Sequence, residues 1–511
     1  MRIDVINNAK RNVIAGVLNK TIVMVFPFIV RTIINLYLGS EYLGLNSLFN
    51  SLLTVLSLSE LGFGTAVVYH MYKPVAENDT PLVCALLNFY RKVYRWVGLV
   101  ILCVGLLLIP FLPKLINGTS PEGINLVGVY LIFLLNTVIS YFLSAYLNSL
   151  LVVYQRSDVT SLINTVVTVG LYFCQIIVVV LTRNYFMYSV LLPVFTVINN
   201  IWVYLFTKKA FPQYKCYGTL GKEQLASIKK LIAGAFIQKA SGVTRNALDS
   251  VCTSAFLGLS LTAIYNNYYT ISNSITVFLS IIYNAVLGGI GNHIALKTKK
   301  ENFQEMRRLD FLYLWISGWC SICLLCLYQP FMRIWMGDNM LLPMPAVIMF
   351  CTYFYLLKLG DIRCIYTDAN GLWWEHRYRS IVEFILNVLL NVLLGKYFGI
   401  YGIIMATIIT LVVCNYFWGT FITFRCYFEK DSRNEYFKYQ AKYSIVSLII
   451  CALSYFVCSF IDFDSTFATI AIRALICTIL PNIMYILIYC KTDEYKYVKD
   501  VVFTRMLKLK R

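Results

Sequence analysis

Long apolar runs recur along the whole chain, separated by short polar connections. A bilayer crossing needs about 20 mainly apolar residues. We identify fourteen runs of suitable length and composition: 12–38, 43–69, 92–113, 124–151, 159–181, 186–207, 231–257, 260–290, 309–332, 342–366, 378–395, 400–424, 443–461 and 466–490. Only 14% of the 511 residues are charged, against about 25% in soluble domains. The chain is therefore expected to be an all-α polytopic membrane protein.

The positions of the 44 lysines and arginines predict an orientation. Four lie in connections that face one side, ten lie inside the predicted spans and the other 30 lie on the opposite side. Cations concentrate on the cytoplasmic side of membrane proteins, so both termini are expected there. The net charge of +19 then reflects orientation and contact with anionic membrane lipids. It does not indicate a nucleic-acid partner.

Almost all of the sixteen cysteines lie in predicted spans, where a thiol behaves as a small hydrophobe. Cys320, Cys323 and Cys326 have the spacing of a metal motif. They fall on one face of an apolar run with no histidine or carboxylate beside them, so packing is the favoured interpretation. We expect no disulfides, no metal site and no cofactor.

The sequence repeats weakly at an offset of about 220 residues, a sign of internal duplication. "LGSEYLGLNSLFNSLLTVLS" from Leu38 resembles "LGLSLTAIYNNYYTISNSIT" from Leu257, and Pro110-Phe111 recurs as Pro330-Phe331. We predict two six-span lobes related by a pseudo-two-fold axis along the membrane normal, plus two C-terminal spans. The expected segments are an N-lobe at 1–207, a cytoplasmic linker at 208–230, a C-lobe at 231–428, two spans within 429–490 and a basic cytoplasmic tail at 491–511.

Several predicted spans carry cations, which are costly at membrane depth. Lys20 and Arg31 are eleven residues apart, so they share one helix face about 16 Å apart along the axis. In the repeat, span seven carries Lys239, Arg245 and Asp249. Repeat symmetry predicts that these two spans face one another, which favours an anion site built from Lys20, Arg31, Lys239 and Arg245. The alternatives are snorkelling of Lys20 and Arg31 to headgroups and a structural Arg245–Asp249 pair.

Span ten also mixes charges, with Lys358, Asp361 and Arg363 close together. A row of polar residues follows helical spacing in span two at Ser47, Ser51 and Thr54. At the repeat offset it maps to Asn266, Thr270 and Asn273. The row predicts either a wet cavity wall for a sugar-like cargo or interhelical hydrogen bonds.

The sequence contains no G-x-x-x-x-G-K-[ST] phosphate loop, so it indicates no ATP hydrolysis by that route. Asp462 and Asp464 have the spacing of a glycosyltransferase motif. They lie on a predicted outer turn too short for a catalytic loop, so a solvated turn is favoured. These features predict a transporter and not an enzyme.

Residues 31–74 resemble the N-terminal signature of the polysaccharide transporters, the O-antigen and capsule flippase branch of the multidrug/oligosaccharidyl-lipid/polysaccharide (MOP) superfamily. The matching residues are Arg31, Leu38, Gly39, Gly44, Leu45, Leu58, Glu60, Leu61, Gly62, Gly64, Met71, Tyr72, Lys73 and Pro74. The signature covers under a tenth of the chain, while the span count and the repeat fit the family throughout.

The resemblance implies a flippase of the bacterial inner membrane. Its cargo would be a polyprenyl-pyrophosphate-linked oligosaccharide, such as an O-antigen, lipopolysaccharide, capsule or exopolysaccharide repeat unit, moved outward by alternating access. Spans one, two, seven and eight would line the cavity. The resemblance also implies drive by a proton or sodium gradient or by membrane potential. Glu60, Asp249 and Asp361 are the candidate coupling acids, and glycosyltransferases and a glycan polymerase of the pathway are possible partners.

Three alternatives stay open from sequence. The same fold could export a lipid II-like precursor. A drug or cation antiporter would want acids at depth, where this chain carries mainly cations. A membrane glycan polymerase or transferase would need a long outer catalytic loop, which the sequence does not show.

Overall fold

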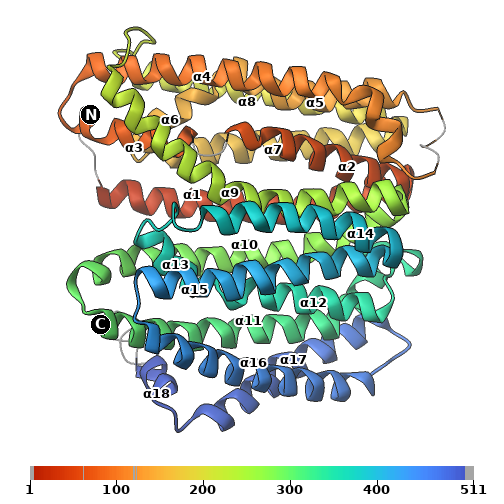
Figure 1. Cartoon of the computed structure of the whole chain (residues 1–511). Helices are drawn as coiled ribbons and strands as arrows, with labels where there is room; N and C mark the ends of the chain where they lie inside the picture. Colours follow the sequence, from red (N-terminus) through yellow and green to blue (C-terminus); the bar gives the residue numbers. More distant parts are fainter. Residues whose placement is uncertain (1–4, 61–62, 119–120, 122, 501–511) are drawn as a thin grey trace. The chain divides into compact units, whose positions relative to one another are not determined.

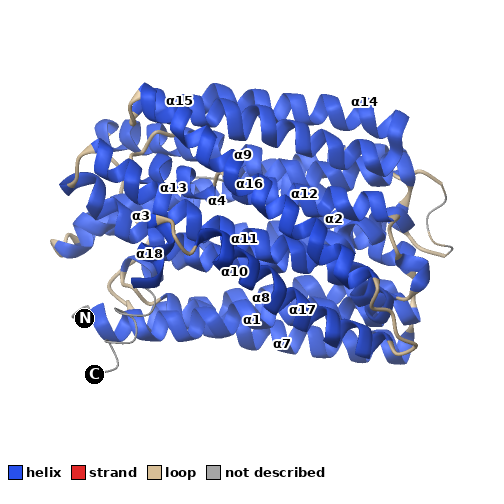
Figure 2. Cartoon of the chain, turned by 90° about the horizontal axis from the view of Figure 1, so that it is seen from below, coloured by secondary structure: helices blue, strands red, loops and turns tan. Residues whose placement is uncertain are grey.

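The computed structural model describes residues 5–60, 63–118, 121 and 123–500, and every described element is a helix or a connecting loop (Figure 2). By packing, the chain divides into two compact units. Unit 1 is Met1–Ala263 and unit 2 is Ile264–Arg511, and the division falls inside one long helix, α10 (Leu259–Leu296).

Unit 1 follows the chain from α1 to α9 (Figure 1). Its helices are α1 (Val5–Tyr37), α2 (Ser40–Leu56), η1 (Ser57–Glu60), α3 (Phe63–Ala76), α4 (Thr80–Leu107), η2 (Ile109–Leu115), α5 (Leu126–Phe142), η3 (Ala145–Leu147), α6 (Asn148–Val153), α7 (Ser157–Thr182), α8 (Tyr185–Ala210) and α9 (Lys222–Leu257). Helix α1 packs on α7, α5 on α8, and α2 on α9.

Unit 2 contains most of α10 and the remaining helices. They are α11 (Lys299–Met336), η4 (Asp338–Met340), α12 (Met344–Leu359), α13 (Asp361–Ala369), α14 (Arg377–Thr410), the π-helix η5 (Leu411–Trp418), α15 (Gly419–Cys426), α16 (Lys430–Ser459), α17 (Thr466–Tyr489) and α18 (Asp493–Lys499). Helix α11 is the centre of this unit, because α12, α16 and α17 all pack against it.

Each of the fourteen predicted spans corresponds to a helix, or to a helix with a break, within the described residues. Among the described residues, eight helical stretches are long and apolar enough to cross a membrane, two of which join successive elements, α12 with α13 and α14 with η5 and α15. Two further pairs qualify when joined across a bend, α4 with η2 at 60° and α5 with η3–α6 at 50°. The predicted all-α multi-spanning fold is confirmed.

The repeated proline has different effects in its two copies. Pro110 lies at the 60° bend between α4 and η2, where it cannot supply a backbone N–H to continue the helix. Pro330 lies inside α11, which continues to Met336. Sequence repetition therefore does not guarantee the same local backbone.

Helix α14 contains the predicted span 378–395 and the first part of the predicted span 400–424, joined at Gly399. Gly399 has φ 58° and ψ −134°, a conformation that strongly favours glycine. Beyond the turn, Gly402 lies against the Leu394 carbonyl, so a Cβ there would overlap it. The helix therefore reverses at Gly399, and the second limb continues into η5 and α15.

Helix α9 packs along α2 and α3 within unit 1. Their close approach depends on Gly44, because a Cβ at this position would overlap the backbone of Leu259 just beyond α9. Ser254 also accepts a hydrogen bond at its carbonyl from the Asn117 N–H at 2.9 Å. The predicted C-lobe begins at residue 231, whereas unit 2 begins at Ile264. The predicted lobe boundaries stay predictions.

Candidate functional site

An open cleft of about 290 Å³ lies in unit 1, between α2, η1, α5 and α9. Its lining residues are Asn50, Leu53, Thr54, Ser57, Leu58, Thr137 and Val243. Four of these side chains carry an amide or a hydroxyl, and the other three are aliphatic. A cleft of this kind can hold a ligand that combines hydrogen-bonding groups with apolar surface.

The polar side of the cleft follows one row along α2 and into η1, at Asn46, Asn50, Thr54 and Ser57. The Thr54 hydroxyl donates to the Asn50 carbonyl at 2.7 Å, and the Asn50 amide donates to the Asn46 carbonyl at 2.8 Å. Ser57 donates in the same way to the Leu53 carbonyl at 2.8 Å. Because the Asn50 amide and the Thr54 and Ser57 hydroxyls donate to backbone carbonyls of the preceding turn, their side-chain oxygen atoms remain as hydrogen-bond acceptors for a ligand in the cleft.

Of the four polar residues that line the cleft, only Thr54 was predicted from sequence, and Asn50, Ser57 and Thr137 were not. The signal was present, since Asn46, Asn50, Thr54 and Ser57 have helical spacing one residue before the predicted row. The predicted row of Ser47, Ser51 and Thr54 shares only Thr54 with this one.

The predicted polar wall lies partly on this surface. Thr54 lines the cleft, Ser51 is half-buried and Ser47 is buried in the packed face of α2. In unit 2, Asn266 and Thr270 are half-buried, and Asn273 is exposed. A shared cavity formed by both rows stays a prediction.

Lys20 is exposed on α1, six residues inside the apolar stretch Ile14–Tyr37. Its neighbour Asn19 faces α7 instead, where its amide donates to the Thr165 hydroxyl at 3.1 Å and the Ser161 carbonyl at 3.3 Å. Successive residues on a helix point about 100° apart, which directs Lys20 away from this contact. Among the described residues, Lys20 has no ion-pair partner.

Arg31 lies six residues from the other end of the same apolar stretch. It is half-buried, and its Nη2 donates to the Ala263 carbonyl at 3.5 Å. The two cations on this helix face therefore differ, because Arg31 has contacts within unit 1 while Lys20 is open to its surroundings.

On α9, Arg245 and Asp249 are both buried, with 6% and 1% of their surface exposed. They lie one turn apart, as expected for residues on one helix face. The described residues include the backbone of Lys239 in α9 and that of Glu60 in η1, but the side chains of both lie outside the description. Their predicted roles stay predictions.

In unit 2, the charges of α12 and α13 meet one another. Lys358 is 5% exposed, and its Nζ lies 3.1 Å from the Asp361 Oδ2. The Tyr313 hydroxyl donates to the same carboxylate oxygen at 2.6 Å. The nearby buried Arg379 is likewise paired with Glu383 at 2.9 Å. Asp361 is thus held by a structural ion pair, although a coupling role for it is not tested by this contact.

Arg363 is buried, with 1% of its surface exposed, and it contacts η5. Its Nη1 donates to the Asn415 carbonyl at 2.9 Å and to the Thr420 hydroxyl at 3.1 Å. A π-helix shifts hydrogen bonds from their α-helical partners and leaves carbonyls available. The guanidinium lies so close to the backbone of Gly419 that a Cβ at this position would overlap it.

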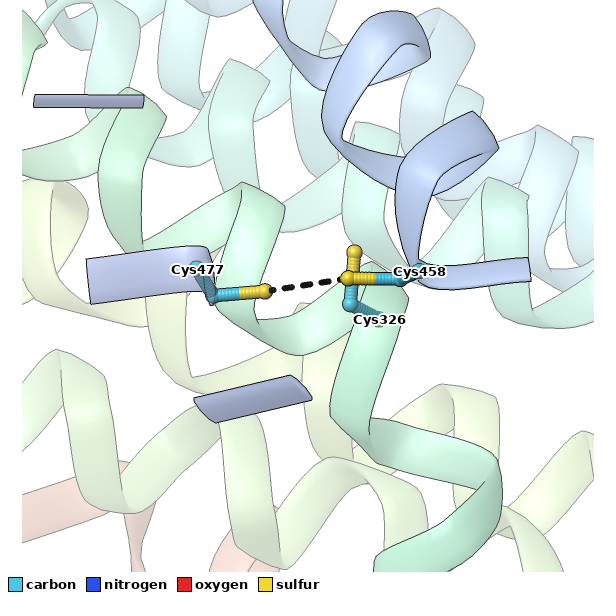
Figure 3. Close-up of side chains that lie close together, drawn as sticks. All are labelled: Cys326, Cys458 and Cys477. Carbon is cyan, nitrogen blue, oxygen red and sulfur yellow. Dashed lines mark hydrogen bonds between the residues drawn. The ribbon is translucent and has the colours of Figure 1, made fainter. Parts of the chain in front are cut away.

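The structure brings three cysteines together from three helices of unit 2 (Figure 3). Cys326 of α11, Cys458 of α16 and Cys477 of α17 are buried, and their sulfur atoms lie within 4.8 Å of one another. The Cys458 and Cys477 sulfurs are 3.8 Å apart. The sequence motif of Cys320, Cys323 and Cys326 therefore supplies only one member. Thiolates at this spacing suit a soft metal, and neutral thiols at this spacing pack as hydrophobes.

Comparison with known proteins supports the fold at low sequence identity. No protein-family profile matches the chain, and no curated protein matches its sequence. Among solved structures, the lipid II flippase MurJ in an inward closed conformation is similar with a TM-score of 0.64 and 16% identity, over 94% of this chain and 98% of that one.

A multidrug resistance MATE family transporter of the MOP superfamily, in an inward-facing conformation, is similar with a TM-score of 0.61 and 13% identity. The match covers 81% of this chain and 98% of that one. An outward-facing structure of a transporter of the same description has a TM-score of 0.53 at 12% identity, covering 81% and 96%. The chain therefore has the fold of MOP superfamily transporters. No enzyme is among these three structures.

Proposed function

We propose that this chain is a flippase that moves a polyprenyl-pyrophosphate-linked oligosaccharide from the inner to the outer leaflet of a bacterial cytoplasmic membrane. The cargo would be an O-antigen, capsule or exopolysaccharide repeat unit. Transport would proceed by alternating access between two conformations, with no resident cofactor. The proposal joins the fold to the resemblance of residues 31–74 to polysaccharide transporters.

The observation that carries the proposal is Lys20. An ammonium at membrane depth costs about 2.5–3.5 kcal/mol on insertion scales, and Lys20 has no carboxylate partner among the described residues. A pyrophosphate cargo would supply the missing counter-charge. Charge-assisted hydrogen bonds to phosphate oxygens are roughly twice as strong as neutral ones.

The unit 1 cleft supports the sugar half of the proposal. Hydroxyl-rich cargo cannot enter hydrocarbon without replacing its hydrogen bonds to water. Asn50, Thr54, Ser57 and Thr137 offer such replacements on one surface. Aliphatic lining residues would cover the apolar faces of the sugar rings.

We further propose that Arg31, Lys239 and Arg245 assist in holding the pyrophosphate. A proton or sodium gradient, or membrane potential, would drive the cycle, with Glu60, Asp249 or Asp361 as ion carrier. Asp249 is the strongest of the three by position, because it is buried beside Arg245 on α9. Membrane lipids surround the chain, and glycosyltransferases and a polymerase would act before and after it.

A second candidate is a flippase for a lipid II-like precursor. The likeness to the MurJ lipid II flippase extends over 94% of the chain, and that cargo would present the same pyrophosphate. A drug or cation antiporter is less well supported, because a cationic drug would be repelled by Lys20.

Reconstituted flipping tests these alternatives. Purified chain in vesicles would receive one of three fluorescent cargoes: a polyprenyl-pyrophosphate oligosaccharide, lipid II or a cationic dye. Movement would be followed with a membrane-impermeant quencher. Preferential flipping of the oligosaccharide supports the proposal, preferential flipping of lipid II supports the second candidate, and transport of the dye alone overturns both.

A further inference from the structure

A second cleft, of about 250 Å³, lies in unit 2 where α15 ends and α16 begins. It is lined by Phe421, Phe424, Arg425, Lys430 and Arg433. Three of its five lining residues are cations, and none is an acid. This basic cleft is separate in the chain from the unit 1 residues to which cargo binding is assigned.

The acids near the three cations do not neutralise them. In the part of the chain that the structure describes, Arg425, Lys430 and Arg433 form no ion pair. Of the acids on the same turn and helix, Glu429 and Asp431 are exposed and do not line the cleft. Glu435 is engaged elsewhere, with its Oε1 2.6 Å from the Arg307 Nη1.

Two of the cations stand where a helix least favours them. Lys430 is the first residue of α16, a helix of 30 residues, and Arg433 follows within its first turn. The positive end of the helix dipole lies here, so cations destabilise this terminus and an anion would be stabilised. An anion bound in the basic cleft would place a negative charge beside the positive end of the α16 dipole and so offset the repulsion between this end and the two cations.

Arg433 is held in place by an aromatic ring. Its guanidinium carbon lies 4.7 Å from the centroid of Phe421. Such a cation–π contact fixes the plane of the guanidinium and leaves its N–H groups available for bidentate contact with phosphate oxygens.

An exposed apolar row leads away from the basic cleft along η5 and α15. Val413, Phe417 and Phe421 follow at intervals of four residues, and 49%, 52% and 49% of their surfaces are exposed. Phe437 of α16 flanks this row, with its ring centroid 5.6 Å from that of Phe417. An acyl chain lying on the row would end beside Arg425, four residues beyond Phe421.

We infer that the basic cleft binds the headgroup of an anionic phospholipid, with phosphate against Arg425, Lys430 and Arg433 and an acyl chain along the apolar row. A basic recess joined to a lipid-facing apolar surface fits an amphiphile better than free phosphate. The cleft also lies at a connection that the charge distribution predicts to be cytoplasmic, where anionic lipids accumulate. The bound lipid would join α15 to α16 and stabilise unit 2.

Lipid-dependent thermal stability of the full chain in detergent tests this inference. Phosphatidylglycerol, phosphatidylcholine and inorganic phosphate would each be titrated, with bound lipid counted by native mass spectrometry. We expect phosphatidylglycerol to raise the Tm by several degrees and to remain bound, phosphatidylcholine to do so at least tenfold more weakly, and phosphate to have little effect.

The variant Arg425→Gln/Lys430→Gln/Arg433→Gln should weaken phosphatidylglycerol binding at least tenfold. The matched control is Lys297→Gln/Lys299→Gln/Lys300→Gln, which removes three exposed cations at another connection and should retain binding. If the triple variant does not fold, Lys430→Gln alone serves, because this side chain is exposed, and a threefold weakening is expected.

Equal binding of the two lipids would overturn the inference, as would equal losses in the triple variant and its control. Stabilisation by inorganic phosphate to the full extent would identify an ion site and also overturn it. Flipping activity is a separate measurement, so failure here would leave the proposed function unaffected.

Discussion

In unit 2, the buried cations Lys358, Arg363 and Arg379 each contact protein oxygen atoms. Lys358 and Arg379 contact carboxylates, and Arg363 contacts carbonyls and a hydroxyl near the π-helix. In unit 1, Lys20 is exposed within an apolar stretch and has no ion-pair partner among the described residues. In the sequence all four lie inside predicted membrane spans, and a carboxylate lies within four residues of each of the unit 2 cations but not of Lys20.

The difference separates structural cations from available ones. A charge that is buried with satisfied partners holds helices together, and removal of either partner is costly. A charge that is exposed contributes little to stability, so its retention at membrane depth indicates a ligand or a headgroup. Mutation of the buried cations Lys358, Arg363 and Arg379 should therefore lower the free energy of unfolding. Mutation of Lys20 should slow transport and leave the free energy of unfolding nearly unchanged.

Arg363→Met should have the largest effect. It leaves the Asn415 carbonyl and the Thr420 hydroxyl without their guanidinium donor in the core of unit 2, and each unsatisfied buried group costs about 1–3 kcal/mol. We expect a loss of about 3 kcal/mol in the free energy of unfolding, measured in detergent. Lys438→Met, an exposed control in the same unit, should change it by under about 0.5 kcal/mol. Similar values for the two variants would contradict the structural role of Arg363.

Asp361→Asn should be next, because it leaves Lys358 buried with a neutral partner. Breaking a buried pair costs about 3–5 kcal/mol, and the partial exposure of the Asp361 side chain, 21%, reduces our expectation to about 2 kcal/mol. Lys358→Met combined with Asp361→Asn should recover at least half of the loss. Additive losses in this double-mutant cycle would show that the two groups act independently.

Lys20→Ala should separate transport from stability. We expect oligosaccharide flipping to fall at least tenfold, about 1.4 kcal/mol, while the free energy of unfolding changes by under about 0.5 kcal/mol. Lys20→Arg should retain most activity, since it keeps the charge. Lys209→Ala, which removes an exposed cation from the end of α8 in the same unit, should flip normally. Full activity of Lys20→Ala would mean that this ammonium only snorkels.

Thr54→Val should have the smallest effect. It removes one oxygen from the unit 1 cleft at nearly constant volume, so we expect about threefold slower flipping of the oligosaccharide and no change for a polyprenyl pyrophosphate without sugar. The matched variant Thr32→Val removes a hydroxyl that donates to the Phe28 carbonyl at 2.8 Å on α1, away from the cleft lining. Equal slowing in the two variants, or for both cargoes, would remove the cleft from the sugar pathway.

The main architecture was predictable because its signal is local. Each apolar run is long enough to require a helix in a membrane. The depth of Lys20, Arg31 and Arg245 along their helices also follows directly from residue counting. These features need no knowledge of which helices are neighbours.

Contacts between distant segments were not predictable in this way. Arg363 meets Asn415, 52 residues later, and Cys326 meets Cys458 and Cys477 instead of its sequence neighbours Cys320 and Cys323. On α2, the predicted row of Ser47, Ser51 and Thr54 has only Thr54 in the cleft, because the packing of α5 and α9 decides which face of α2 stays open. Helical spacing defines the faces of a helix, but it does not say what covers them.

The sequence by itself determined a chain of membrane-spanning helices with cations at stated depths, since hydrophobic length and charge are properties of individual segments. Only the tertiary structure decided which cations are neutralised, where polar atoms line a cleft and that α9 packs with unit 1. The physical reason is that burial and pairing are relations between segments. An identical lysine or arginine is structural where its neighbours supply oxygen, and available for a ligand where they do not.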